Sequence, residues 1–363
     1  MRLNFASKRI LIAPLDWGLG HATRCIPIAE WLRRQGCEIF FACDGYQKTL
    51  LQQEFPDNTF LLLKGYKIQY SGNKRMLPLK ILLQAPKILF AIKHEHEWLQ
   101  KTIKDHNIDL VISDNRYGLW TDKIPCIFLT HQLHIRASLN WLEKLIQKIN
   151  YRYINHYIEC WVPDFRGDFN IAGNLSHPAI LPKVKVKYIG VLSRFKNISE
   201  ALKKYDWLVI LSGPEPQRTI LENKIINTAL QLTEKFLLVR GKPGSSEMIS
   251  TPANCVTVNH LDTNDMEQAF ADSKYVLSRS GYTTVMELLS LQKKTLLIPT
   301  PGQTEQEYLA NHLMQQKWCY CCEQDDDLKV HIKKAVLFDY RFPRMPASSL
   351  EDAIADFFTH YLS

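Results

Sequence analysis

The segment SRSGYTTVMELL, residues 278–289, has the residue types of a phosphate and sugar site. Ser280 and Gly281 end an apolar run, and Thr283 or Thr284 can cap the helix that the following periodicity predicts. The free amides of a first helical turn, at the positive end of the helix dipole, bind phosphate. Glu287 is one turn inside this helix, on the face of the threonines, where its carboxylate can accept two hydrogen bonds from a ribose diol. The alternative is a capped helix with a solvated glutamate.

Two further loops repeat this order of strand, loop and helix. In LSGPEPQRTILENKI, Gly213 lies in the loop and Arg218 at the mouth of the helix, where a guanidinium would reinforce diphosphate binding. In PTPGQTEQEYLANHL, Gln303, Glu305 and Gln306 stand at the start of a helix, and such amides and carboxylates suit sugar hydroxyls. Each segment alone is a weak signal, so the prediction depends on their occurring together in one half of the chain.

A glycine loop, PLDWGLGHATR, also follows the first apolar run of the chain. Its Gly18-x-Gly20-x-x-Thr23 is one residue short of the dinucleotide fingerprint, and Asp44 lies about where that fingerprint places a ribose-binding acid. Thr23 does not signal the close helix–strand approach that a third glycine permits. We therefore expect Gly18 and Gly20 to keep the backbone clear of an acceptor molecule, rather than to hold a pyrophosphate.

His21, in the same loop, is the candidate general base, because an imidazole titrates near neutral pH and can take a proton from a hydroxyl. Asp114 in SDNRYG and His131 in THQLH follow later apolar runs and are second candidates. Structural alternatives stand beside each role. His21 could order its loop by bonding to backbone, Asp114 could cap the adjacent turn, and His131 could pack beneath the site.

Strand and helix patterns alternate along the chain in two series and must position these loops. The strands predicted in the first series are Arg9–Ala13, Glu38–Cys43, Thr59–Leu63, Asp109–Ser113, Cys126–Thr130 and Glu159–Val162. Those in the second series are Trp207–Leu211, Phe236–Val239, Cys255–Val258, Tyr275–Ser278 and Thr295–Ile298. The pattern predicts an α/β protein of two Rossmann-like, doubly wound domains, with the polar loops at the carboxyl ends of the strands facing a cleft.

The overall composition is ordinary for a soluble globular enzyme, with 46% hydrophobic and 23% charged residues. No apolar run approaches the roughly 18 to 20 residues of a membrane span, and the first residues lack a signal-peptide core. The nine cysteines are odd in number and scattered, which favours reduced thiols in a cytoplasm. The CYCC run at 319–322 has no second ligand pair at zinc spacing, so we expect buried strand thiols and no metal.

Positive charge is concentrated between Lys64 and Lys93, where there are seven basic residues and no acid. The seven are Lys64, Lys67, Lys74, Arg75, Lys80, Lys87 and Lys93, with the apolar stretches MLPLKILL and APKILFAI between them. A basic rim around exposed apolar side chains is typical of a protein that sits on an anionic membrane surface. An internal helix whose lysines face water is an equal alternative. Nucleic acid is not expected as a partner, because no recognition module accompanies the charge.

The segment from Val256 to Asn311 resembles the nucleotide-sugar domain of GT-B glycosyltransferases, in particular family 28. That family contains the N-acetylglucosaminyltransferase of peptidoglycan lipid II synthesis and the galactolipid synthases. The resemblance is strong over roughly 205–315 and looser in the first half, where GLGHATR is similar to the family's Gly-rich, His-bearing first loop. It implies an acceptor-side domain over 1–192, a nucleotide-sugar-binding domain over 193–345, and a last helix within 346–363 that packs back toward the first domain.

The resemblance also implies roles for residues of the second half. Leu261 matches the residue whose backbone meets uracil, Ser280 and Gly281 match the phosphate turn, Glu287 matches the ribose-binding acid, and Gln306 falls near the residues that read the donor sugar.

Further matches concern the hinge and the acceptor. Gly190 and Arg194 match an interdomain Gly-x-x-x-Arg whose arginine reaches the diphosphate, and His21 matches the histidine that faces the acceptor. Two features depart from the family: prolines stiffen the loop GPEPQR, and Glu307 replaces a second glutamine. The identity of the donor sugar therefore stays open.

The expected reaction is inverting, metal-independent transfer of an N-acetylhexosamine or hexose from a UDP-sugar to a lipid-linked or cell-envelope glycan acceptor. Helix amides with Arg194 and Arg218 would stabilise the departing diphosphate in place of a metal, and no cofactor besides the donor is expected. The protein would be cytoplasmic, at the inner face of the cytoplasmic membrane. A UDP-sugar 2-epimerase of the same fold, a non-catalytic nucleotide-sugar-binding subunit and a dinucleotide oxidoreductase are the alternatives.

Overall fold

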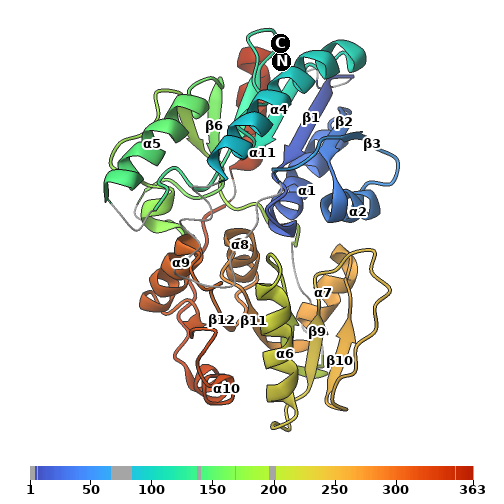
Figure 1. Cartoon of the computed structure of the whole chain (residues 1–363), viewed down its shortest axis with the longest axis vertical. Helices are drawn as coiled ribbons and strands as arrows, with labels where there is room; N and C mark the ends of the chain where they lie inside the picture. Colours follow the sequence, from blue (N-terminus) through green and yellow to red (C-terminus); the bar gives the residue numbers. More distant parts are fainter. Residues whose placement is uncertain are drawn as a thin grey trace.

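The computed structural model describes residue 5 and residues 7–66, 84–136, 140–167, 169–195, 202–347 and 349–362. Within these residues the chain forms two α/β domains that lie one above the other along the long axis (Figure 1). Each domain has one parallel sheet with helices on both of its faces, as the alternating pattern predicts. The prediction of two doubly wound domains is confirmed.

The first sheet has seven parallel strands in the order β3-β2-β1-β4-β5-β6-β7. Its strands are β1 Arg9–Pro14, β2 Glu38–Cys43, β3 Thr59–Leu62, β4 Leu110–Asp114, β5 Cys126–Leu129, β6 Glu159–Val162 and β7 Lys185–Tyr188. The central strands β1, β4, β5 and β6 are buried along almost their whole length, which is why they appear in the sequence as short continuous apolar runs.

The second sheet has six parallel strands in the order β10-β9-β8-β11-β12-β13. Its strands are β8 Tyr205–Ile210, β9 Phe236–Val239, β10 Cys255–Val258, β11 Ser273–Ser278, β12 Thr295–Leu297 and β13 Tyr320–Cys321. The short edge strand β13 holds part of the CYCC run, and Cys319 and Cys322 on either side of it are buried.

Helices connect most of the successive strands, whereas loops join β4 to β5 and β9 to β10. Those of the first domain are α1 Leu19–Arg34, α2 Gly45–Glu54, α4 Ala85–His106, α5 Asn140–Ile154 and the 3-10 turn η2 Gly173–Leu175. Those that follow are α6 Gln217–Ala229, α7 Thr263–Ala271, α8 Tyr282–Ser290, α9 Thr304–Gln315, α10 Leu328–Leu337 and α11 Leu350–Tyr361. Aspartates cap three of them, because the carboxylates of Asp44, Asp262 and Asp327 accept hydrogen bonds from first-turn amides of α2, α7 and α10.

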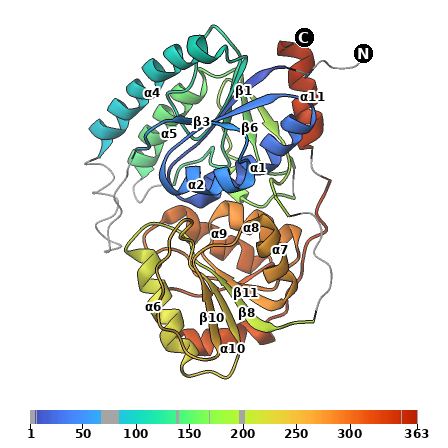
Figure 2. The ribbon, with the colours of Figure 1, turned by 90° about the vertical axis from the view of Figure 1, so that its right-hand side faces the viewer.

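The last helix, α11, lies against the first domain although it follows the second domain in sequence (Figure 2). Phe358 packs on Phe5 with ring centroids 4.5 Å apart, and Phe357 meets Trp161 of β6 edge-on at 5.8 Å. Asp356 pairs with Lys187 of β7. The chain therefore crosses between the domains twice, once after β7 and once before α11.

The two domains meet through α1 and α8 (Figure 2). The Oγ1 of Thr283, in α8, donates to the carbonyl of Gly20, in α1, over 3.0 Å. A Cβ on Gly20 would lie 3.3 Å from Oγ1 of Thr283, so a larger residue at position 20 would crowd the contact between α1 and α8. The amino ends of α1, α8 and α9 and the carboxyl ends of both sheets thereby face one region between the domains.

Candidate active site between the two domains

His21 and Asp114, predicted separately from two loops, lie side by side at the edge of the first sheet. His21 is the third residue of α1, and Asp114 ends β4, whose neighbour β1 leads into α1. The Nδ1 of His21 is 2.9 Å from Oδ2 of Asp114. Nε2 of His21 has no hydrogen bond to any described residue, and 15% of the side chain is exposed. An imidazole held in this way by a carboxylate presents its second nitrogen to an acceptor.

Arg24, one turn further along α1, shares the same carboxylate. Its Nε donates to Oδ2 of Asp114 over 2.9 Å, and its Nη2 donates to Oδ1. Burial alone would raise the pKa of Asp114, but the charges of Arg24 and His21 and their hydrogen bonds lower it to about 2. Asp114 is therefore ionised throughout the range in which the imidazole titrates.

His131, which follows β5, joins this cluster to the second domain. Its Nδ1 lies 2.9 Å from Nη1 of Arg24, and its Nε2 lies 2.7 Å from Oε1 of Glu305 in the first turn of α9. The ring also stacks on Tyr282 of α8, with centroids 4.3 Å apart. Three of the residues singled out as possible catalytic groups thus belong to one network, together with Arg24 and Glu305.

The surroundings of His21 set its affinity for a proton. Burial lowers its pKa, Asp114 opposes that effect, and the positive charge of Arg24 lowers the pKa further. The imidazole is therefore neutral near neutral pH. Its Nδ1 also lies 3.0 Å from Nη2 of Arg24, but that nitrogen donates to Oδ1 of Asp114, so Nδ1 of His21 donates to Oδ2 of Asp114 and Nε2 can accept a proton. This is the protonation state that a general base requires.

The amino end of α8, which the sequence predicts to hold phosphate, faces the first domain. Gly281 is the N-cap residue with extended backbone, and a Cβ built on it would meet nothing within 4 Å. No side chain on Gly281 therefore crowds this end of the helix, where free first-turn amides would bind an anion. The hydroxyl of Ser280 donates to the carbonyl of Gln306 over 2.8 Å, which ties this turn to α9.

Glu287, the predicted ribose ligand, forms a buried ion pair with Arg194. The Nε of Arg194 is 3.1 Å from Oε1 of Glu287, and both side chains are less than a tenth exposed. Burial raises the pKa of Glu287, and the arginine opposes this effect. Within the described residues, Nη1 of Arg194 is buried and has no hydrogen-bond partner. An unpaired buried guanidinium nitrogen is suited to an anionic oxygen of a ligand.

Arg218, predicted as a diphosphate ligand, is buried inside the second domain. Its Nε donates to Glu215 over 2.7 Å and its Nη1 to Glu222 over 3.0 Å, and Nη2 bonds to Thr219. Gly213 lies ahead of α6 in a left-handed conformation with φ of 97°. The structure thus brings Arg194 to the site with an unpaired nitrogen, whereas carboxylates of its own domain hold Arg218.

The two glutamines at the start of α9 differ in their contacts. The side-chain oxygen of Gln306 accepts from the amide of Thr300 over 2.9 Å, so this residue shapes the loop before α9. Gln303 is the N-cap residue, and its Oε1 is buried with no partner among the described residues. Of the two, Gln303 is the one whose side-chain oxygen has no hydrogen-bond partner among the described residues.

An open cavity of about 530 Å³ adjoins the loop that contains Leu261. It is lined by Gln53 of the first domain and by Lys242, Gly244, Ser245, Asn259, His260, Asp262 and Asp265 of the second. Leu261 itself packs partly against the core. Burial and the nearby Arg194 lower the pKa of His260 to about 4, so this imidazole is neutral and polar rather than cationic.

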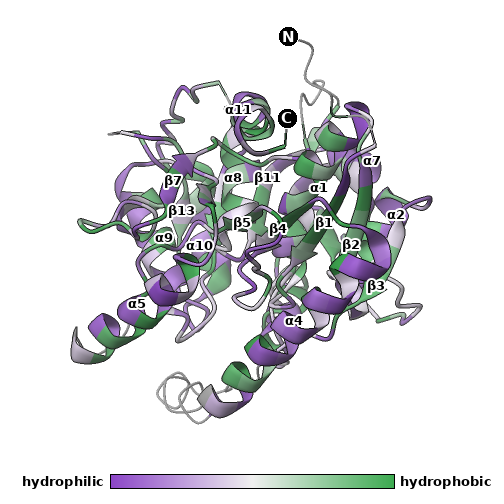
Figure 3. Cartoon of the chain, turned by 90° about the horizontal axis from the view of Figure 1, so that it is seen from above, coloured by the Kyte–Doolittle hydropathy of each residue, from purple (hydrophilic) through white to green (hydrophobic). Residues whose placement is uncertain are grey.

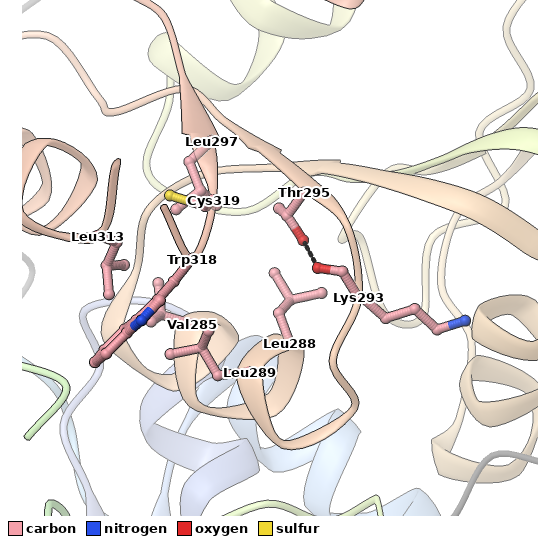
Figure 4. A pocket seen from close by; sticks show the side chains of 9 residues that line it. All are labelled: Val285, Leu288, Leu289, Lys293, Thr295, Leu297, Leu313, Trp318 and Cys319. Atoms are coloured by element: carbon pink, nitrogen blue, oxygen red, sulfur yellow. Dashed lines mark hydrogen bonds between the residues drawn. The ribbon is translucent and has the colours of Figure 1, made fainter. Parts of the chain in front are cut away.

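A second cavity lies beneath α8 and is lined mainly by apolar side chains, among them Val285, Leu288, Leu313 and Trp318 (Figure 4). Its volume is about 10 Å³, so it is a packing void rather than a ligand site. One group in the described part of the chain has metal-ligand types close together: Cys322 and Asp326 in the loop after β13, and His331 in α10. It lies outside the interdomain cluster.

Most of the basic segment, residues 67–83, lies outside the described residues. The described remainder is residues 64–66 and the first part of α4, where Leu89 and Phe90 are 53% and 73% exposed and Lys87 and Lys93 lie on the surface. Helix α5 carries a similar exposed stripe of Trp141, Leu145 and Ile149, which the sequence analysis did not single out. Both helices project from the same side of the first domain (Figures 2 and 3).

Known proteins similar to this chain share both its fold and its sequence pattern. Residues 217–356 match the glycosyltransferase family 28 C-terminal domain. A protein of Methanosarcina acetivorans named "Uncharacterized glycosyltransferase" is 25% identical over 321 residues, which cover 82% of this chain and 81% of that protein. The UDP-N-acetylglucosamine--N-acetylmuramyl-(pentapeptide) pyrophosphoryl-undecaprenol N-acetylglucosamine transferase of Pasteurella multocida is 23% identical, with coverage of 83% and 80%.

Solved structures show the same two-domain arrangement. Spinosyn rhamnosyltransferase SpnG superposes with a TM-score of 0.63 at 12% identity, over 98% of this chain and 96% of that one. MurG of Acinetobacter baumannii superposes with a TM-score of 0.53 at 16% identity, over 91% and 90%. These structures and this chain share the GT-B fold. Because residues 217–356 match the family 28 C-terminal domain and the curated relatives over most of the chain are glycosyltransferases, this chain is a glycosyltransferase.

Proposed function

We propose that this glycosyltransferase moves an N-acetylhexosamine or hexose from a UDP-sugar to a hydroxyl of a lipid-linked or cell-envelope acceptor, with inversion and without a metal. The observation that carries the proposal is the His21–Asp114 pair, which faces the open amino end of α8 across the domain boundary. A group that removes a proton and a group that holds phosphate are the two requirements of sugar transfer.

The donor would lie against the second domain. The first-turn amides of α8 and the unpaired Nη1 of Arg194 would hold the diphosphate, and Glu287 would exchange part of its bonding with Arg194 for the ribose hydroxyls. The cavity beside Leu261 has room for the uracil ring of the donor. The printed name of the Pasteurella relative includes a UDP-N-acetylglucosamine donor, which supports a uridine nucleotide here.

The transfer step follows from these positions. Nε2 of His21 takes the proton of the acceptor hydroxyl while the acceptor oxygen forms a bond to the anomeric carbon. The bond between that carbon and the diphosphate oxygen breaks, and its electron pair leaves with UDP. Asp114 orients the imidazole and stabilises its protonated form, whereas the α8 amides and Arg194 stabilise the charge that develops on UDP. A single displacement of this kind inverts the anomeric centre.

The acceptor is proposed to lie at the inner face of the cytoplasmic membrane. Exposed apolar side chains on α4 and α5, with lysines beside them, form a surface that an anionic bilayer would bind. None of the helices in the described part of the chain has the length and apolarity that a bilayer-spanning segment needs. The lipid-carried acceptor named for the Pasteurella relative supports a similar substrate class for this chain.

The proposal is tested by a thermal-shift screen of UDP-, GDP- and dTDP-sugars with this protein, followed by product analysis with the best binder. We expect a UDP-sugar to raise the melting temperature and an acceptor to be required for rapid UDP release, with or without EDTA. Stabilisation only by another nucleotide would contradict the UDP donor. A sugar product inverted at C2 would contradict transfer, and dependence on a divalent ion would contradict the metal-free mechanism.

A further inference from the structure

The second domain places one carboxylate against the network that contains the proposed base. Glu305, in the first turn of α9, has its Oε1 2.7 Å from Nε2 of His131, and only 21% of its side chain is exposed. His131 belongs to the first domain and Glu305 to the second, 174 residues apart in the chain. This contact exists only while the two domains are together.

The hydrogen bonds around His131 fix which of its nitrogens carries the proton. Arg24 can only donate, so Nδ1 of His131 accepts from Nη1 of the arginine over 2.9 Å. The proton of the neutral ring is therefore on Nε2, which donates to Glu305. Because both nitrogens are engaged, His131 is not available to take a proton from an acceptor. It connects Glu305 to Arg24, which in turn holds Asp114 beside His21.

The charges in this network do not cancel while His21 is neutral. Arg24 balances Asp114, and Glu305 has no other ion-pair partner among the described residues. Burial would raise the pKa of Glu305, but His131, His21 and Arg24 lower it, so the carboxylate stays ionised. The groups that interact electrostatically with His21 are Arg24 of α1, Asp114, His131 and Glu305 of α9. Cys25 of α1 and Tyr282 of α8 lie beside the same network, near Arg24. A proton taken up by His21 restores neutrality.

We propose that Glu305 is a positioning residue of the transfer step, which supplies from the donor-side domain the negative charge that stabilises protonated His21. The inference rests on the proposed role of His21 as the base. Its consequence is that the base reaches full strength only when the donor-side domain is closed against the acceptor-side domain. The acceptor is then deprotonated at the moment when the donor sugar is in place.

Glu305→Gln tests this inference, because glutamine keeps an oxygen that accepts from His131 but removes the charge. We expect kcat to fall about tenfold while the affinity for UDP, which does not include the sugar, stays unchanged. We also expect the acidic limb of the pH profile, where activity rises as His21 loses its proton, to move down by about half a unit. The control is Glu351→Gln, which changes an exposed carboxylate of α11 and should leave kcat and the pH profile unchanged.

An NMR titration of His21 in the wild type and in Glu305→Gln gives a readout that needs no turnover. The expected result is a lower pKa for His21 in the variant. An unchanged pKa together with an unchanged pH profile would overturn the inference, since a purely structural hydrogen bond predicts that outcome. If the pKa of His21 shifts in the variant but the wild type transfers no sugar, the proposed function is wrong, while the electrostatic effect of Glu305 on His21 is still supported.

Discussion

At the scale of residues, the site depends on how a few buried charges are shared. Asp114 serves both His21 and Arg24, and its lowered pKa keeps it ionised as the imidazole titrates. Glu287 and Arg194 form a second buried ion pair, in which Nη1 of Arg194 has no hydrogen-bond partner among the described residues. Each pair combines a group suited to the substrate with a partner that fixes its position and charge.

Glu287→Ala tests the donor side at this scale. The change removes the proposed ribose ligand and leaves Arg194 buried without its carboxylate, so the affinity for UDP should fall by about 10- to 100-fold. Calorimetric titration with UDP measures the loss. Ser290→Ala, near the far end of the same helix, is the matched control, because its hydroxyl bonds only to the carbonyl of Met286. Equal UDP affinity in both variants would exclude Glu287 from the donor site.

At the scale of elements, helix ends and strand ends set the positions of all these groups. The chain bends from β1 into α1 at Gly18, whose φ is 117°, and this turn brings His21 over the end of β4. The amino ends of α8 and α9 approach from the other domain. Helices α4 and α5 project from the first domain with apolar side chains exposed, so they are the elements that would meet a membrane.

The membrane role of α5 is tested by a double variant, Trp141→Ser with Leu145→Ser. These side chains are 64% and 48% exposed, so the fold should tolerate the change, while flotation with vesicles of anionic lipid should fall severalfold. Met248→Ser is the control, because this side chain is 95% exposed in the second domain. If the double variant floats as well as the wild type, α5 is not part of the membrane surface. If the wild type does not float with the vesicles, the proposed membrane surface is wrong.

Helix α11 is expected to hold the first domain together as one of its own elements. Phe357 is fully buried against Trp161, so Phe357→Ala should lower the free energy of unfolding by about 3–5 kcal/mol. Urea unfolding followed by tryptophan fluorescence measures the change. Thr359→Ala, an exposed position in the same helix, should cost far less. Similar losses for the two variants would contradict this account of α11.

At the scale of the whole molecule, the sheets were more predictable than the contacts between domains. Short apolar runs bounded by polar loops indicated eleven strands that the structure contains, because buried parallel strands leave that pattern in the sequence. His21 and Asp114 were predicted as strand-end residues, and the fold brings them together. Arg24 was missed, although its spacing of three from His21 on one helix was a local signal.

Other features of the site depend on tertiary packing that spacing does not reveal. The pairing of His131 with Glu305 requires knowing how two domains sit together. The pairing of Arg218 with Glu222 follows an i,i+4 spacing that is visible in the sequence, yet the same arginine suited a diphosphate equally well. The burial of Arg218 beside the buried Glu222, which spacing does not reveal, decides which contacts the guanidinium makes.

The central claim is that His21 removes the acceptor proton between a donor-binding and an acceptor-binding domain. The most direct measurement compares His21→Ala with the wild type in sugar transfer and in UDP binding, using the donor identified by the thermal-shift screen. We predict a loss of transfer of at least about 100-fold with UDP affinity unchanged, because the histidine lies on the acceptor side. Transfer at the wild-type rate by His21→Ala would contradict the account.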